Sequence, residues 1–206
     1  MKTLTTLLLA IVIAFPSFSQ KRNVDVGDFS ELSLSIAANL YLKQGSSNEV
    51  IIECDDDRFE DIEFKMSGDR LVIKNESDWG WNKGWRKSEV TIYVTMKDID
   101  ELSVSGSGMI ESKGQLKTND LELSVSGSGD MELQLASEEI EMSISGSGTI
   151  RLDGDAEEAQ ARISGSGKVK AEDMTVKVFE ARISGSGSCY ITATDEVQAR
   201  ISGSGS

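Results

Sequence analysis

Apolar and polar residues alternate along the C-terminal half of the chain around a recurring tetrapeptide, Ser-Gly-Ser-Gly. Six copies follow one another every 18 to 21 residues, beginning at Ser105, Ser126, Ser145, Ser164, Ser184 and Ser202. Apolar residues occupy alternate positions before the first copy (Leu102, Val104) and return after it (Ile110). Period-two alternation on both sides of a short motif predicts two strands that face one interior. A repeat sustained near this length predicts a solenoid with one coil per repeat.

The glycines of the tetrapeptide are expected at a corner of each coil. If the alternation continues through the turn, both glycines point inward, where a Cβ atom would crowd the core, and glycine also allows a positive φ. The serines then point outward in two rows. The predicted turn glycines are Gly106, Gly108, Gly127, Gly129, Gly146, Gly148, Gly165, Gly167, Gly185, Gly187, Gly203 and Gly205.

Two outward columns change character along the predicted solenoid. The column two residues before the tetrapeptide changes from serine to arginine: Ser103, Ser124, Ser143, Arg162, Arg182 and Arg200. The column four residues before it begins with three glutamates: Glu101, Glu122, Glu141, Gln160, Glu180 and Gln198. We expect Glu180 to pair with neighbouring arginines. Stacked like charges are mildly destabilising, so the three leading glutamates are a candidate cation site, with a solvated face as the alternative.

Residues 20–98 lack the tetrapeptide but keep the alternation. The apolar residues from Leu32 to Leu42 resemble a degenerate repeat, and Phe64 to Ile73 reads as a hairpin around Ser67-Gly68-Asp69. Further strands are expected at 50–54 and 88–96. Because an open solenoid end exposes unpaired backbone, we expect 20–98 to be a strand-rich cap with degenerate coils, forming one continuous domain with the repeats of 99–206.

The segment 78–87, DWGWNKGWRK, contains all three tryptophans of the chain among basic residues. Tryptophans on a glycine-containing loop are candidates for a platform that stacks sugar rings or anchors a protein partner. The predicted binding residues are Trp79, Trp81, Trp85 and Arg86. The alternative is that the tryptophans fold back and seal the end of the solenoid.

Residues 1–19 are typical of a secretory signal peptide, with Lys2 before an apolar run and Ser17-Phe18-Ser19 before a cleavage site at Gln20. The mature protein is therefore expected in the periplasm, at the cell surface or in the medium. No later stretch approaches the roughly 20 apolar residues of a membrane span, so stable membrane insertion is not expected. Losing Lys2 would change the net charge from −14 to −15, which opposes binding to nucleic acid.

Residues that carry catalytic chemistry are few. The chain has no histidine, which removes the commonest general base and histidine-ligated metal sites. Cys54 and Cys189 are expected several coils apart, too far for a disulfide, as small buried side chains. Ser-Gly-Ser-Gly lacks the context of a nucleophile elbow or a phosphate loop. We therefore expect a non-enzyme without a cofactor, although the glutamate column near Arg151 leaves a carbohydrate-active β-helix enzyme open.

The segments LYLKQG, VIIECDDD, IEFKMSGDRLVIK and VTIYVTM, followed by iterated (L/I)S(V/I)SGSG units, together span nearly all of residues 24–206. In these segments the chain resembles the head GIN domain family of auto-transporter adhesins. The resemblance implies an all-β, right-handed single-stranded β-helix in the envelope of a Gram-negative bacterium. It also implies a role in adhesion, and it brings no catalytic residues with it.

The leading functional hypothesis is an adhesin-like module that binds a glycan or a cell-surface protein. The alternative is a structural spacer or assembly protein of the envelope. The chain ends directly after its sixth tetrapeptide, whereas members of the family usually continue through a closing strand. We expect either a truncated sequence or a last coil that a partner chain completes, which includes a homo-oligomer formed through the open C-terminal coil.

Overall fold

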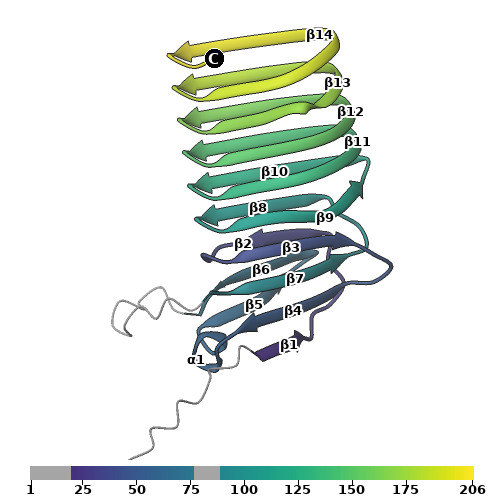
Figure 1. Ribbon diagram of the computed structural model, residues 1–206, viewed down its shortest axis with the longest axis vertical. Coiled ribbons are helices and arrows are strands. Elements are labelled where there is room, and N and C mark those ends of the chain that lie inside the picture. The colour runs from purple at the N-terminus through teal and green to yellow at the C-terminus, as the bar shows by residue number, and fades with distance from the viewer. Residues whose placement is uncertain (1–19, 77–88) are drawn as a thin grey trace, which may run out of the picture.

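The computed structural model describes residues 20–76 and 89–206. The predicted signal peptide and the predicted binding residues Trp79, Trp81, Trp85 and Arg86 lie outside this part of the chain. The described residues form a tall stack of strands with the C-terminal coil at one end and the N-terminal strands at the other (Figure 1). The expected all-β solenoid is confirmed, with about five turns.

The N-terminal strands are short, and the only helix of the described residues lies among them. They are β1 (Gln20–Val24), β2 (Glu31–Leu34), β3 (Asn39–Gln44), β4 (Glu49–Cys54), α1 (Asp56–Phe59), β5 (Ile62–Ser67), β6 (Arg70–Asn75) and β7 (Thr91–Met96). The strands of the repeats lengthen along the chain. They are β8 (Glu101–Gly106), β9 (Met109–Lys117), β10 (Asp120–Gly127), β11 (Asp130–Gly146), β12 (Thr149–Gly165), β13 (Lys168–Gly185) and β14 (Ser188–Gly203).

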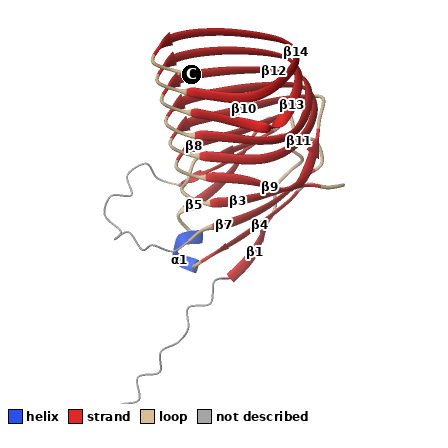
Figure 2. Cartoon of the chain, turned by 45° about the horizontal axis from the view of Figure 1, so that its top comes forward, coloured by secondary structure: helices blue, strands red, loops and turns tan. Residues whose placement is uncertain are grey.

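Each coil has two faces that meet at the tetrapeptide corner. The strands β11 to β14 have 16 to 18 residues each; they leave one corner, bend and return to the next (Figure 2). We call the strands that leave a corner the outgoing face (β3, β7, β9 and the first halves of β11 to β14, flanked by β4 and β1). The strands that return form the incoming face (β2, β6, β8, β10 and the second halves, flanked by β5). All neighbours between β8 and β14 pair in parallel.

The predicted columns are confirmed by the strand register. On the incoming face, Leu123 pairs with Leu102 on one side and with Met142 on the other. The same interior column continues as Ala161 and Ala181, and all five side chains are at most 4% exposed. The alternation therefore places several parallel ladders of apolar side chains inside each face, and together these ladders fill the solenoid.

The two glycines of each tetrapeptide have different roles. The first has a positive φ, as in Gly127 (φ +112°), and a Cβ atom there would lie 2.7 Å from the carbonyl oxygen of Gly106 in the preceding coil. The second is buried in the first five copies, and a Cβ on Gly129 would lie 2.4 Å from Cγ1 of Val104. The prediction that both point inward is right only for the second, because the turn made at the first glycine interrupts the alternation. The serines of the corners are exposed, as predicted.

The N-terminal strands form degenerate coils, but not in the order of the chain. β2 pairs in parallel with both β8 and β6, while β3 pairs in parallel with both β9 and β7. Leu32 lies opposite Leu102 and Leu40 opposite Ile110, which confirms the degenerate repeat. The chain thus completes the coil of β2 and β3, travels to the far end, and returns through β6 and β7 before it starts the repeats.

Antiparallel strands form the N-terminal end. β4 pairs with β1 and β7, and β5 pairs with β6 in the predicted hairpin. We call residues 20–76 and 89–98 the cap. The interior of the cap is continuous with that of the repeats, since one cluster of buried side chains extends from Phe29 to Ile183.

The last coil leaves interior positions uncovered. Val197 and Ile201 continue interior columns of the incoming face, yet 61% and 48% of these residues are exposed. Among the described strands β14 pairs only with β13, and its other edge lacks a neighbouring strand, although the N–H of Cys189 donates to the carbonyl oxygen of Ser206 at 2.8 Å.

The two cysteines are free thiols at opposite ends of the stack, Cys54 on β4 and Cys189 on β14. Burial raises the pKa of the Cys189 thiol to about 12, and burial also raises the pKa of Cys54. Both thiols are therefore protonated near neutral pH. None of the helices in the described part of the chain is long and apolar enough to cross a bilayer.

Candidate functional site

The predicted glutamate column exists, but two of its three members have cationic partners. Glu122 lies between Glu101 and Glu141 in the register of the incoming face. Glu101 pairs with Arg70 of the cap, and Glu141 Oε2 lies 3.0 Å from Nη1 of Arg162. Burial raises the pKa of Glu101, and the charge of Arg70 opposes this shift. The partner of Glu101 thus comes from the cap and that of Glu141 from the arginine column, and neither pairing was expected from the sequence.

No three acidic, histidine or cysteine side chains of residues 20–76 and 89–206 come together in a way that could hold a metal ion. Arg151 does not lie beside the glutamate column. It follows the corner and is on the outgoing face, between Glu132 and Lys170. The expected closeness of Arg151 to the glutamate column, on which the possibility of a carbohydrate-active enzyme depended, is therefore wrong. The arginine column is confirmed, and Arg182 Nη2 lies 2.7 Å from Glu180 Oε1.

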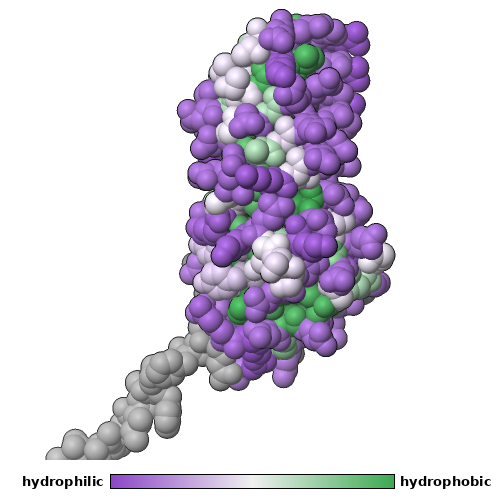
Figure 3. All heavy atoms as spheres, turned by 90° about the vertical axis from the view of Figure 1, so that its right-hand side faces the viewer, coloured by the Kyte–Doolittle hydropathy of each residue, from purple (hydrophilic) through white to green (hydrophobic). Residues whose placement is uncertain are grey.

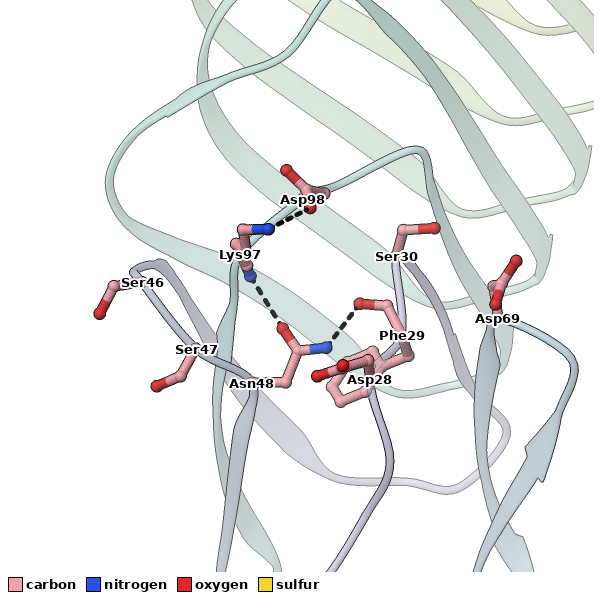
Figure 4. A pocket seen from close by; sticks show the side chains of 9 residues that line it. All are labelled: Asp28, Phe29, Ser30, Ser46, Ser47, Asn48, Asp69, Lys97 and Asp98. Carbon is pink, nitrogen blue, oxygen red and sulfur yellow. Dashed lines mark hydrogen bonds and ion pairs between the residues drawn. The ribbon is translucent and has the colours of Figure 1, made fainter.

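A polar cleft of about 450 Å³ opens on the cap, between residues 28–30, the turn after β3 and the end of β7 (Figure 4). Asn48 joins the three segments. Its Nδ2 donates to the carbonyl oxygen of Phe29 at 2.7 Å, and its Oδ1 accepts a hydrogen bond from the backbone N–H of Lys97 at 2.9 Å. The Asn48 amide is thus occupied in holding the cap together, which is a structural role.

A pair of tyrosines lies on the outgoing face of the cap, where the sequence patterns singled out no site. Tyr41 on β3 and Tyr93 on β7 are directly opposite in the register, with ring centroids 5.6 Å apart and planes tilted by 35°. Their neighbours along each strand are fully buried, so both rings point outward and are half-buried. Ile51 on β4 continues the same row beyond Tyr93. We call Ile51, Tyr93 and Tyr41 the tyrosine row.

Each tyrosine is accompanied by a lysine and a glutamate. Lys113 Nζ lies 4.2 Å from the centroid of the Tyr41 ring and pairs with Glu111. That hydrogen bond raises the pKa of Lys113, so the ammonium group stays charged.

The other end of the row repeats this arrangement. Lys21 Nζ lies 4.9 Å from the Tyr93 centroid and 3.4 Å from Oε2 of Glu53, which also accepts a hydrogen bond from the Tyr93 hydroxyl at 3.4 Å. The row is therefore framed by two Lys–Glu pairs whose charges cancel.

The only sequence signal for this site is an aromatic residue at an outward position of each strand. Tyr41 and Tyr93 are 52 positions apart, and only the exchanged order of the coils makes β3 and β7 neighbours. The face seen in Figure 3 is mostly hydrophilic, and hydrophobic residues reach its surface most broadly in the lower part, over the cap.

The fold and these features define a β-solenoid whose accessible side chains are arranged in columns on two lateral faces. A family model described as "Putative auto-transporter adhesin, head GIN domain" matches residues 28–206. The chain belongs to this family, as its resemblance implied.

Solved structures confirm the fold. A protein described as a "putative adhesin" from Bacteroides fragilis superimposes with a TM-score of 0.77 at 18% identity, over 90% of this chain and 94% of the other. A "putative lipid binding protein" from Parabacteroides distasonis gives a TM-score of 0.70 at 22% identity, over 92% and 95%. A comparison with curated proteins finds no significant match.

Proposed function

We propose that this protein is an exported, non-catalytic, adhesin-like module that binds a glycan or protein surface outside the cytoplasm. The observation that carries the proposal is the register of the outer side chains. Equivalent residues of successive coils form straight columns on both faces, such as Arg162, Arg182 and Arg200. Such a surface is extended and repeats from coil to coil, which suits a polymer or another protein surface better than a small substrate.

Membership in the family described as "Putative auto-transporter adhesin, head GIN domain" supports the same proposal. Export is supported by the sequence of residues 1–19, which has the features of a signal peptide. The net charge of −14 opposes nucleic acid as a partner.

The test is a binding screen with mature protein beginning at Gln20. Immobilised protein is offered a glycan array, extracted outer-membrane and host cell-surface proteins, and neutral lipid vesicles. We expect saturable binding to a glycan or a protein. Binding only to vesicles, or to nothing, would contradict the proposal. The triple variant Trp79→Ala, Trp81→Ala, Trp85→Ala, together with Arg86→Gln, decides whether the tryptophan segment contributes, since binding that survives these changes removes it from the site.

A second candidate function, assembly of the envelope, is favoured by the uncovered last coil. The unpaired edge of β14 and the exposed Val197 and Ile201 offer backbone and apolar groups to another strand. The opposite end also has edge strands, β1 and β5, but the large hydrophobic side chains that are exposed among the described residues all lie on β14. Two copies would therefore meet through the same end, which gives a closed two-fold dimer and not a filament.

Light scattering on the mature protein tests this assembly. We expect a dimer that becomes a monomer when Val197→Lys and Ile201→Lys are combined, because burying two ammonium groups in the contact is unfavourable. Thr192→Lys is the matched control, since Thr192 is an exposed outward residue of the same strand. A monomeric wild-type protein across the accessible concentration range would contradict the assembly.

A further inference from the structure

We infer that the tyrosine row on the outgoing face of the cap is a binding site for a neutral oligosaccharide chain. This inference rests on the proposed function and gives it a place and a ligand class. The row consists of Ile51, Tyr93 and Tyr41, and its polar frame consists of Lys21, Glu53, Glu111 and Lys113.

The shape of the row favours an extended ligand. Ile51, Tyr93 and Tyr41 occupy one register position on three consecutive strands, β4, β7 and β3. Neighbouring strands lie about 4.8 Å apart, so the three side chains form a line that crosses the strands and runs along the solenoid axis. A chain of sugar rings can follow such a line along the outer edges of the tyrosine rings, with the ammonium groups of Lys113 and Lys21, which lie over these rings, beside its hydroxyls.

The row is held rigidly before any ligand arrives. β7 pairs with β4 on one side and β3 on the other, while β3 pairs in addition with β9. The inward neighbours Leu40, Leu42, Ile92 and Val94 are at most 1% exposed. A site on paired strands above a packed core loses little conformational entropy on binding, which favours affinity for a weakly interacting ligand.

The frame supplies the polar groups that sugar hydroxyls need. Carboxylates of Glu53 and Glu111 accept hydrogen bonds, and the ammonium groups of Lys21 and Lys113 donate them. Tyrosine contributes an apolar ring for the C–H face of a sugar and a hydroxyl for its edge. Apolar rings between donors and acceptors match the amphipathic surface of a pyranose.

The charges of the site favour a neutral ligand. Two lysines and two glutamates cancel within the frame, while the whole chain carries −14. An acidic polysaccharide meets net repulsion from the protein. A cationic ligand meets an ammonium group already placed over each ring. A protein partner would be expected to need a broader apolar centre than three side chains.

The probes are neutral oligosaccharides, namely the β-1,4-linked glucose and N-acetylglucosamine series and mannose oligomers, with heparin as the acidic comparison. Binding is measured by calorimetry and by saturation-transfer NMR on the mature protein. We expect one neutral series to bind, with saturation reaching the sugar C–H protons. Tyr41→Ala and Tyr93→Ala should each weaken binding about tenfold or more. Tyr93→Phe keeps the ring and should lose only a few-fold.

The matched control is Tyr190→Ala. Tyr190 lies in the same row of the outgoing face at the other end of the solenoid, beside Lys170, and 46% of it is exposed. It has no tyrosine neighbour on the strand with which it pairs, so its replacement should leave binding unchanged. The pair Lys113→Gln and Glu111→Gln leaves the rings in place and should weaken binding several-fold through the frame.

Three outcomes would overturn the inference. They are a wild-type protein that binds none of the neutral series, one that prefers heparin, and binding that persists in a folded Tyr41→Ala, Tyr93→Ala double variant. The proposed function has its own readout in the surface-binding screen. If the double variant still captures a cell-surface glycan or protein in that screen, the proposed function stands but the tyrosine row is not its binding site.

Discussion

At the scale of single residues, the second glycine of each tetrapeptide is where consecutive coils touch. A Cβ atom on Gly148 would lie 2.4 Å from the carbonyl oxygen of Gly129 and 2.4 Å from Cγ1 of Val125. Both are fixed, one by the backbone ladder and the other by the packed core. The corners of consecutive coils can therefore lie this close only because glycine has no Cβ atom.

Gly148→Ala should destabilise the protein by about 1–3 kcal/mol, the usual cost of forcing extra atoms into a packed site. Gly27→Ala is the matched control, because a Cβ at Gly27 meets nothing within 4 Å and should change stability by less than about 0.5 kcal/mol. Urea unfolding followed by circular dichroism measures both. Equal stability of the two variants would show that the corners can move apart.

At the scale of elements, one arginine joins the cap to the first repeat. Arg70 on β6 pairs with Glu101 on β8, and its Nε lies 2.7 Å from Glu31 Oε2 on the intervening β2. The pKa of Glu101 is raised mainly by burial, so its carboxylate is less stable in the folded protein than in the unfolded chain. Its ionisation thus lowers stability as the pH rises through its folded pKa, and Arg70 limits that loss.

Arg70→Gln should raise the pKa of Glu101 further. The variant should lose little stability below the ordinary glutamate pKa of 4.5 and up to about 1 kcal/mol near neutral pH. Side-chain NMR titration and urea unfolding at both pH values measure these effects. Arg162→Gln is the control, since Arg162 and Glu141 are both about half exposed and their pair should contribute little. A loss independent of pH would assign Arg70 to packing alone.

At the scale of the whole molecule, the columns of the repeats could be predicted from the sequence, while the order of the coils in the cap could not. Columns such as Leu102, Leu123 and Met142 follow from a fixed period, because each strand pairs with the next repeat. In the cap, β2 and β3 lie between coils that come later in the chain. No local pattern encodes that exchange. For this reason neither the tyrosine row nor the Arg70–Glu101 pair could be predicted from the sequence.

Hydrogen exchange should report this architecture directly. In monomeric protein, about half of the amides of β14 should exchange quickly, because one side of an edge strand has no acceptors. Those of β12 should be protected, since β12 pairs with both β11 and β13. Exchange resolved by mass spectrometry over residues 149–203 makes the comparison. Equal protection of β12 and β14 in a monomer would contradict an open edge.

The corners also make the molecule adjustable in length. The backbone N–H of Ser128 donates to the Gly106 carbonyl at 2.8 Å, and Ser147, Ser166 and Ser186 repeat this bond to Gly127, Gly146 and Gly165 at the same distance. Each coil thus offers the next coil the same corner hydrogen bond that it makes with the coil before it. Duplicating one repeat would move the cap about 4.8 Å farther from the other end without a new interface. The reach of the cap can change in equal steps while its own side chains stay the same.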